Sequence, residues 1–366
     1  MIKRNISLKE MTTLRVGGKA NYFVEVQSVD ELITSLNLAK SKNLDVLVIG
    51  DCSNIVIPGE GFDGIVIKVL ITEIIITKET TDLIFIKVGA GVNWDSFVDY
   101  SVSKDYWGIE NLSLIPGTVG AFPVQNVGAY GQVANSVVSE VHVIERESNQ
   151  LKILTNTQCE FSWRRSIFNT HDKNRYIIIH VLFKLNKKYA PKLSRVDLKK
   201  EVFRLNGLVN IELNNDIRVN QTTIRQAVIN LRTSGEKLPN CKNEYNTGTF
   251  FRALSLKKSQ FYKLAIRLLI NYGIFTTVRA LGYRLKYGVG DSYILPSALL
   301  LMKIKDIKSI NENFELFKKN PAVLIHNGKG THKELINFIN DIKKNVYKKS
   351  GIQIPVEPEV IGQNIN

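Results

Sequence analysis

Residues 115–131 read Ile-Pro-Gly-Thr-Val-Gly-Ala-Phe-Pro-Val-Gln-Asn-Val-Gly-Ala-Tyr-Gly, and no charged residue interrupts the chain from Asn111 to Ser139. This uncharged stretch is long enough to cross a bilayer, but Pro116, Pro123 and the glycines exclude a continuous apolar helix. Glycines at this density let the backbone approach a ligand closely and leave amide N–H groups to bind it. Because the run lacks Lys and Arg, we expect the bound group to be flat or largely apolar, such as a large ring cofactor.

Composition indicates a multidomain protein of the cytoplasm. The chain has 366 residues, 44% of them hydrophobic, which is enough for two or three domains with cores of their own. It has neither the apolar segment of a signal peptide nor a long clean apolar stretch, so we expect no membrane insertion. Cys52, Cys159 and Cys241 form no Cys-x-x-Cys pair, and the histidines lack metal-ligand spacing. We therefore expect reduced cysteines and no metal site.

The formal net charge of +15 raises the question of nucleic-acid binding. The lysines are scattered over many segments, and no stripe of aromatic and basic residues accompanies them. The positive charge also has a simpler explanation, because an AT-rich coding sequence favours Lys, Asn and Ile, in which this chain is rich. Polyanionic small ligands such as nucleotides and diphosphates favour a basic protein as well, so no nucleic-acid partner is expected.

The first half of the chain reads as a strand-rich α+β region, and the second half reads as mainly helical. The elements expected in the first half are a helix capped by Ser28 and strands at residues 44–50, 65–69, 82–91 and 176–185. The polar residues 186–200 make a plausible boundary. The elements expected after it are amphipathic helices at residues 220–233 and 332–349, a helix end at Gly351 and an extended strand at 352–362.

Two further glycine-rich turns follow strands in the first half, at Gly50–Asn54 and Val88–Gly91. A strand that ends in glycine and small polar residues presents its amides to a phosphate, although many ordinary strand-to-turn junctions look the same. Together with residues 115–131, these turns suggest one extended ligand that contains adenine, pyrophosphate and a flat ring.

Three more clusters carry groups suited to chemistry. Arg164 and Arg165 follow Trp163 and could form a guanidinium fork for a carboxylate, or a solvated turn with Trp163 in the core. Thr249 precedes two phenylalanines and could donate a proton or cap a helix. Glu357 and Glu359 would share one face of a strand, either as a functional pair or as surface carboxylates.

Taken in order, the motifs resemble the UDP-N-acetylenolpyruvoylglucosamine reductase (MurB) family of peptidoglycan synthesis. They are the segments Thr12–Gly18, Gly50–Asn54, Val88–Gly91, Ile115–Gly131 and Arg164–Phe168, the Gly248-x-Phe-Phe motif, and the terminal Glu-Pro-Glu-Val at residues 357–360. The resemblance covers nearly the whole chain and is weakest at residues 253–330.

The resemblance implies an α+β protein with a two-subdomain FAD-binding fold of the vanillyl-alcohol-oxidase (PCMH) type. The subdomains would span residues 1–70 and 71–205, and a C-terminal α+β substrate-binding domain would span 206–366, its last strand at 352–366 returning to the active site. The cofactor would be non-covalent FAD, and the partners would be NADPH and a UDP-sugar. The sequence does not reveal the oligomeric state, and a monomer is expected. NADPH would reduce the flavin, and flavin N5 would then deliver a hydride to the enolpyruvyl group, whose neighbouring carbon must be protonated.

The family pattern also implies roles for individual residues. Catalysis would rest on Arg164, on Glu359 and on Thr249, which stands where the family has serine. The residues implied in cofactor binding are Gly50, Ser53, Asn54, Gly89, Pro116, Gly117, Gly120, Gln125, Asn126, Gly128, Tyr130 and Gly131. The residues implied in substrate binding are Trp163, Arg195, Arg232 and Lys237.

Several positions depart from the family pattern. Trp163 occupies the place of an active-site tyrosine, and an indole donates a hydrogen bond but accepts none. Cys52 replaces a glycine in the turn expected at the pyrophosphate. Arg195 lies nearest the place of a tyrosine on the loop that covers the substrate. These departures keep two alternatives open: a diverged FAD- and NADPH-dependent oxidoreductase for another enol ether or sugar nucleotide, and a non-catalytic flavin or nucleotide binder.

Overall fold

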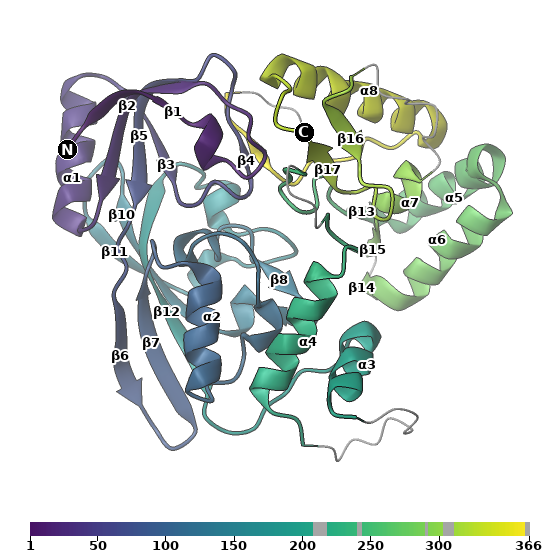
Figure 1. The fold of residues 1–366 in the computed structure, drawn as a ribbon, viewed down its shortest axis with the longest axis horizontal. Helices are drawn as coiled ribbons and strands as arrows, with labels where there is room; N and C mark the ends of the chain where they lie inside the picture. Colours follow the sequence, from purple (N-terminus) through teal and green to yellow (C-terminus); the bar gives the residue numbers. More distant parts are fainter. Residues whose placement is uncertain (208–217, 240–243, 290–291, 303–310, 363–366) are drawn as a thin grey trace. The chain divides into compact units, whose positions relative to one another are not determined.

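The computed structural model describes residues 1–207, 218–239, 244–289, 292–302 and 311–362 (Figure 1). The chain forms two compact units, and each combines helices with β-sheet. The first unit comprises Met1–Ile6, Ala20–Cys52 and Phe62–Ser234, and the second comprises Ser7–Lys19, Ser53–Gly61 and Gly235–Asn366. The predicted α+β character is therefore present in both units, while the predicted subdomain borders near residues 70 and 205 stay predictions.

A four-stranded sheet with one connecting helix opens the first unit. Its strands follow the order β1 (Lys3–Ser7), β2 (Lys19–Val26), β5 (Phe62–Val69), β3 (Asp45–Ile49), with β5 parallel to both β2 and β3. Helix α1 (Val29–Ser41) begins where predicted, because the Ser28 hydroxyl accepts the Glu31 N–H at 3.2 Å. The strand predicted at residues 44–50 is present as β3, but the prediction that it is buried is wrong, since β3 is the last strand in the order and is only partly buried.

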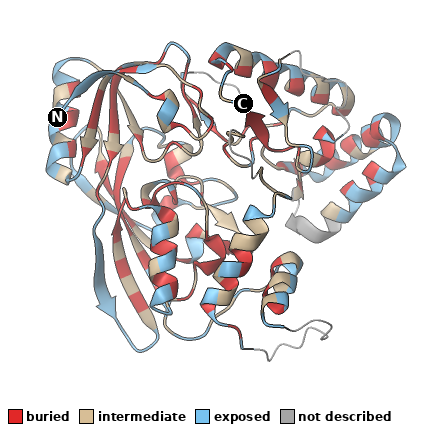
Figure 2. Cartoon of the chain, viewed as in Figure 1, coloured by how far each residue is buried: buried red, intermediate tan, exposed pale blue. Residues whose placement is uncertain are grey.

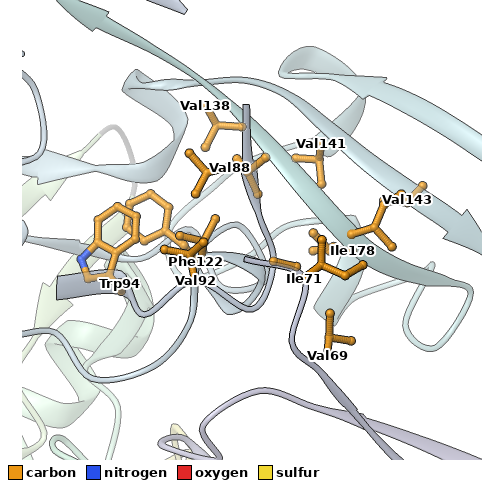
Figure 3. Packing of buried hydrophobic residues seen from close by; sticks show 14 of the residues in the cluster. Val69, Ile71, Val88, Val92, Trp94, Phe122, Val138, Val141, Val143 and Ile178 are labelled. Carbon is orange, nitrogen blue, oxygen red and sulfur yellow. The ribbon is translucent and has the colours of Figure 1, made fainter. Parts of the chain in front are cut away.

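A five-stranded antiparallel sheet forms the centre of the first unit. Its strands follow the order β11 (Leu151–Thr155), β10 (Val138–Glu145), β12 (Tyr176–Asn186), β7 (Leu83–Gly89), β6 (Ile74–Glu79). β12 is buried from Ile177 to Val181, as its mainly apolar sequence predicts for a strand covered on both faces. Figure 3 shows the core beside this sheet, where Trp94 of helix α2 (Trp94–Ser103) stacks on Phe122 with ring centroids 3.7 Å apart.

A smaller apolar cluster in the first unit holds helices α3 (Val196–Leu205) and α4 (Gln221–Thr233). Their buried side chains pack around Trp107, with Tyr130 and Leu193 at the margin. An ion pair supplements the packing, because the Arg225 guanidinium on α4 binds both carboxylate oxygens of Asp95 on α2, at 2.7 and 2.9 Å. The helix predicted at residues 220–233 is thus confirmed.

The second unit contains short sheets and longer helices. Its strands are β4 (Ile55–Val56), β13 (Leu254–Lys257), β14 (Gly288–Val289), β15 (Ser292–Leu295), β16 (Phe314–Leu316), β17 (Leu324–His326) and β18 (Glu359–Val360). Its helices are α5 (Lys258–Tyr272), α6 (Ile274–Tyr287), α7 (Ala298–Leu301) and α8 (His332–Ser350). Helix α8 buries its apolar face and ends at Gly351, whose φ of 71° is left-handed, as predicted. None of the described helices combines the length and apolar character needed to cross a bilayer.

The predicted continuous strand at 352–362 is wrong. Only Glu359–Val360 forms a strand, parallel to β4, and Val356 makes an isolated bridge with Phe251. Pro355 and Pro358 interrupt the ladder because proline has no N–H to donate. Glu357 consequently lies in a bend and does not share a strand with Glu359.

A buried histidine makes the stability of the second unit depend on pH. Nδ1 of His326 donates to the Leu14 carbonyl at 2.8 Å, and Nε2 accepts the Gly330 N–H at 2.7 Å, so the ring is neutral. Burial lowers the pKa of His326, against opposing hydrogen bonds, and burial also lowers the pKa of His332. A lowered pKa means that the folded state favours the neutral imidazoles. Their contribution to the free energy of unfolding is fully present above the unfolded-state pKa near 6.5, and it is lost as the pH falls through the lower folded-state pKa.

We therefore expect the free energy of unfolding to decrease between about pH 7 and about pH 5, by at most about 1.4 kcal/mol per pH unit for each histidine. Urea unfolding across this range tests the expectation. His332→Gln should flatten the dependence, whereas the same change at His171, whose side chain is 57% exposed, should not. A slope that His332→Gln and His326→Gln both leave unchanged would contradict the assignment.

Candidate active site

The glycine-rich turns of the first unit pack directly against one another. The Gly120 N–H donates to the Ala90 carbonyl at 2.9 Å, which joins the run 115–131 to the turn after β7. A Cβ on Gly120 would lie 2.7 Å from Cβ of Ala90, and one on Gly50 would lie 2.5 Å from Oγ1 of Thr118. The turns that the sequence suggested for one ligand thus meet in one place, and glycine is required there for contact between protein segments.

Gly89 shows this requirement most sharply. A Cβ at this position would lie 2.2 Å from the Ile71 carbonyl oxygen, which is backbone and cannot rotate away. We expect Gly89→Ala to destabilise the first unit by about 2–4 kcal/mol. Gly282 in α6 has nothing within 4 Å of the corresponding position, so Gly282→Ala should be neutral or stabilising by about 1 kcal/mol. Thermal unfolding of both variants gives the comparison, and equal stability of the two would refute it.

The donor set along residues 115–131 suits FAD. The run has no charged side chain, and Gly117, Asn126, Tyr130 and Gly131 have positive φ values of 122°, 45°, 47° and 89°. Left-handed residues among right-handed ones turn successive N–H groups toward one side, which forms an anion-binding concavity. Backbone amides in a run that has no charged side chain of its own fit both a neutral ring and a pyrophosphate, so the residues present fit the cofactor.

Asn126 has a structural task within this run. Its Nδ2 donates to the Ser162 carbonyl at 2.8 Å, and its Oδ1 accepts the Asn135 N–H at 3.0 Å. The side-chain amide is engaged at both ends by the protein. Any contribution of Asn126 to cofactor binding would therefore come from its backbone and from the shape that it imposes.

Arg164 lies at the tip of a two-residue turn that is fastened to the glycine-rich run. Ser162 and Arg165 exchange backbone hydrogen bonds of 2.9 and 3.2 Å around the tip, and the Ser166 hydroxyl donates to the Val124 carbonyl at 2.6 Å. Arg164 has a left-handed φ of 56°, which is unfavourable for a residue with a Cβ. The structure thus brings the predicted catalytic arginine to the Val124–Asn126 segment.

Trp163 beside it is 55% exposed, so the alternative of a core tryptophan is wrong. The Arg164 guanidinium lies over its indole, 5.6 Å from the ring centroid. The indole can steady the arginine through a cation–π contact, which a tyrosine in the same place would also provide. The departure from the family pattern at this position therefore keeps an aromatic platform.

The sequence did not reveal a buried polar network that holds the Tyr130 turn. Nδ2 of Asn111 donates to the carbonyls of Tyr130 and Lys192, at 2.8 and 2.7 Å, and joins this turn to the segment before Arg195. Gln132 donates to Glu110 at 2.8 Å, and burial raises the pKa of that carboxyl. Two polar residues at 110 and 111 amid apolar neighbours are the only sequence signal of this network.

The predicted substrate residues Arg195, Arg232 and Lys237 have different surroundings. Arg195 is paired with Asp197 at 3.3 Å just before α3. Arg232 lies near the end of α4, where burial lowers its pKa while Tyr130 and Asp95 oppose that shift. The structure therefore places Arg195 and Arg232 in the part of the first unit that holds the Tyr130–Gly131 turn. Lys237 belongs to the second unit, where its carbonyl accepts from Asn320 at 3.0 Å.

In the second unit, Thr249 and Glu359 occupy neighbouring backbone segments. Thr249 makes a bridge with Val323, which excludes the alternative that it caps a helix. The Glu357 N–H donates to the Phe250 carbonyl at 2.8 Å, and the Glu359 N–H donates to the Asn54 carbonyl at 3.0 Å. Both predicted catalytic side chains are exposed, and the predicted cofactor residues Ser53 and Asn54 belong to the same unit.

The conformation of Cys52 shows how a larger residue fits into the Gly50–Asn54 turn, where the family pattern has glycine. Its φ of 50° is left-handed, which is the conformation that glycine favours there. The side chain is 5% exposed and faces Gly50, with Sγ 3.8 Å from its carbonyl oxygen, and burial raises the pKa of the thiol to about 12. The thiol is therefore an inert packing group.

The comparisons with known proteins agree with this geometry. A family model described as an FAD binding domain matches residues 20–153. Proteins named UDP-N-acetylenolpyruvoylglucosamine reductase from Bdellovibrio bacteriovorus and Thermobifida fusca are 32% and 33% identical to this chain, and each alignment covers 98% of both sequences. The chain belongs to the UDP-N-acetylenolpyruvoylglucosamine reductase family. The solved UDP-N-acetylenolpyruvylglucosamine reductase from Thermus caldophilus matches with a TM-score of 0.61 over 98% of both chains, at 16% identity.

Membership of the UDP-N-acetylenolpyruvoylglucosamine reductase family confirms the predicted fold class and the predicted FAD cofactor. The matched residues 20–153 contain the three glycine-rich turns, whereas Arg164, Thr249 and Glu359 lie outside them. The roles of individual site residues stay predictions.

Proposed function

We infer that this chain is an NADPH-dependent flavoenzyme, a UDP-N-acetylmuramate dehydrogenase. It reduces the enolpyruvyl group of UDP-N-acetylglucosamine enolpyruvate to UDP-N-acetylmuramate in peptidoglycan biosynthesis. The observation that carries the inference is the family relationship over 98% of the chain, which includes an FAD-binding domain. The geometry adds a glycine-rich run to which the Arg164 turn is fastened.

The three glycine-rich turns, at Gly50–Asn54, Val88–Gly91 and residues 115–131, would bind FAD through their backbone amides. The chemistry that bound FAD supplies is the transfer of a hydride from NADPH to the terminal carbon of the enolpyruvyl group. Negative charge then develops on the neighbouring carbon and on the carboxylate of the substrate. A preorganised cation favours the transition state more than the ground state, because the charge is larger there. Arg164, held by its turn, is the residue that we assign to this carboxylate.

The developing carbanion must receive a proton. Thr249 presents an exposed hydroxyl from a backbone fixed by the bridge to Val323, and this is the group that we assign as the donor. Position matters more than intrinsic acidity for such a donor. Glu359 is exposed on β18. We assign it to the same step, in which it acts as an acid toward the substrate carboxylate. Trp163, Arg195, Arg232 and Lys237 are assigned to substrate binding.

NADPH and a UDP-sugar are the partners in this proposal, and the enzyme acts as a monomer in the cytoplasm. A diverged reductase for another enol ether is the second candidate, and the exposed Trp163 in place of tyrosine favours it. The test is to purify the protein, measure bound flavin by absorbance, and follow NADPH oxidation with and without UDP-N-acetylglucosamine enolpyruvate. We expect substrate-dependent oxidation. Flavin reduction without substrate-dependent turnover would leave only the second candidate, and a protein that binds no FAD would exclude both.

A further inference from the structure

The hairpin of helices α5 and α6 exposes an unusual number of large apolar side chains. Helix α5 buries Phe261, Leu264, Leu268 and Tyr272, which is the stripe that a helix on a protein core needs. A second stripe on the same helix is exposed, with Tyr262, Ile266, Leu269 and Ile270 at 40%, 62%, 49% and 75%. A helix that is apolar on two sides has a partner on the second side.

The exposed apolar surface continues into α6 across the turn at Gly273. Ile274, Val278 and Leu281 are exposed at helical spacing, and Phe275 is 86% exposed. Ile270, Ile274 and Phe275 flank the turn and form the tip of the hairpin. Pale blue, exposed positions accordingly recur along α5 and along the part of α6 whose burial Figure 2 shows.

Charge identifies the partner. The sequence from Tyr245 to Gly290 contains no Asp or Glu, and α5 and α6 together carry six Lys and Arg residues. Lys258, Lys263, Arg267 and Arg279 are exposed. A surface that pairs large apolar side chains with basic residues alone is typical of helices that lie at the interface of an anionic membrane. A second copy of the hairpin would bring six more like charges against it, which opposes self-association.

We propose that the α5–α6 hairpin docks on anionic lipid bilayers, with the tip residues in the interface and the basic residues among the headgroups. The contact is peripheral, since each helix is short and carries several charges. It would hold the enzyme at the membrane surface without a spanning segment. The hairpin lies within residues 253–330, where the family motifs are weakest, and it contains none of the assigned site residues.

Cosedimentation of the full chain with vesicles tests the proposal independently of enzyme activity. We expect binding to phosphatidylcholine vesicles that contain phosphatidylglycerol, weaker binding to phosphatidylcholine alone, and release by salt. The double variant Ile270→Ser/Phe275→Ser should lower the partition coefficient about 100-fold, roughly tenfold for each side chain removed. Lys263→Glu/Arg279→Glu should abolish the preference for anionic lipid.

The matched control is Leu151→Ser/Ile153→Ser on β11, where the side chains are 58% and 52% exposed. It should bind vesicles as the unchanged protein does, and circular dichroism should show all variants folded. Absence of binding to anionic vesicles, or equal binding by the tip variant and the control, would overturn the proposal. A dimer in sedimentation velocity that the tip variant abolishes would also overturn it, because the partner would then be a second copy.

Discussion

Glu359→Gln should slow the oxidation of the reduced flavin by the UDP-sugar about 10²- to 10⁴-fold while NADPH still reduces the flavin at its normal rate. The carboxyl group of Glu359 is assigned as an acid to the stage at which negative charge develops on the substrate, and the reduction of flavin by NADPH precedes that stage. The substitution should not disturb the fold. The Glu359 side chain is exposed, and strand β18 is held by backbone bonds, including the one from the Glu359 N–H to Asn54.

Anaerobic stopped-flow absorbance resolves the two half-reactions. Glu357→Gln is the matched control, because Glu357 is two residues away in a bend and is not assigned to the reaction. It should behave as the unchanged enzyme in both steps. If Glu359→Gln slows both half-reactions equally, its role is structural and the assignment fails.

Thr249→Val should produce a loss of similar size, about 10²- to 10⁴-fold in the same half-reaction, since valine keeps the shape of threonine but has no proton to donate. Thr249→Ser should retain most of the activity, because it keeps the hydroxyl and frees the χ1 rotation that threonine restricts. Valine suits the extended backbone at the bridge to Val323, so the variant should fold.

A solvent isotope effect sharpens the Thr249 test. Proton delivery that limits the second half-reaction slows it in D₂O, and the effect should be seen in the unchanged and Thr249→Ser enzymes. Thr249→Val enzyme as fast as the unchanged one would show that another group supplies the proton.

Local sequence patterns predicted the elements that depend on near neighbours. The Ser28 cap and the end of α8 at Gly351 each involve a few consecutive residues, and both are confirmed. The extended strand at 352–362 failed because the apolar pattern was weighted above two prolines that cannot donate to a ladder. The strand at 44–50 is confirmed, but its expected burial is wrong because the order of strands in a sheet is not a local property.

The glycine-rich run shows where sequence reasoning about a site stops. It indicated a bound ring, and the family relationship identifies that cofactor as FAD. Yet Gly50, Gly89 and Gly120 are required first by contacts with Thr118, Ile71 and Ala90. These partners are about 20 to 70 positions away in the chain, so the sequence does not display the contacts. The hydrogen bonds of Asn111 to the carbonyls of Tyr130 and Lys192 could not be predicted for the same reason, since these residues are also far apart in the sequence.

The proposed enzyme carries out one reaction, and a single turnover tests this activity most directly. The enzyme is reduced with one equivalent of NADPH without oxygen and then mixed with UDP-N-acetylglucosamine enolpyruvate, while flavin absorbance and product mass are followed. We expect the absorbance of oxidised flavin to return as one equivalent of UDP-N-acetylmuramate forms. Flavin that stays reduced in the presence of this substrate would contradict the account.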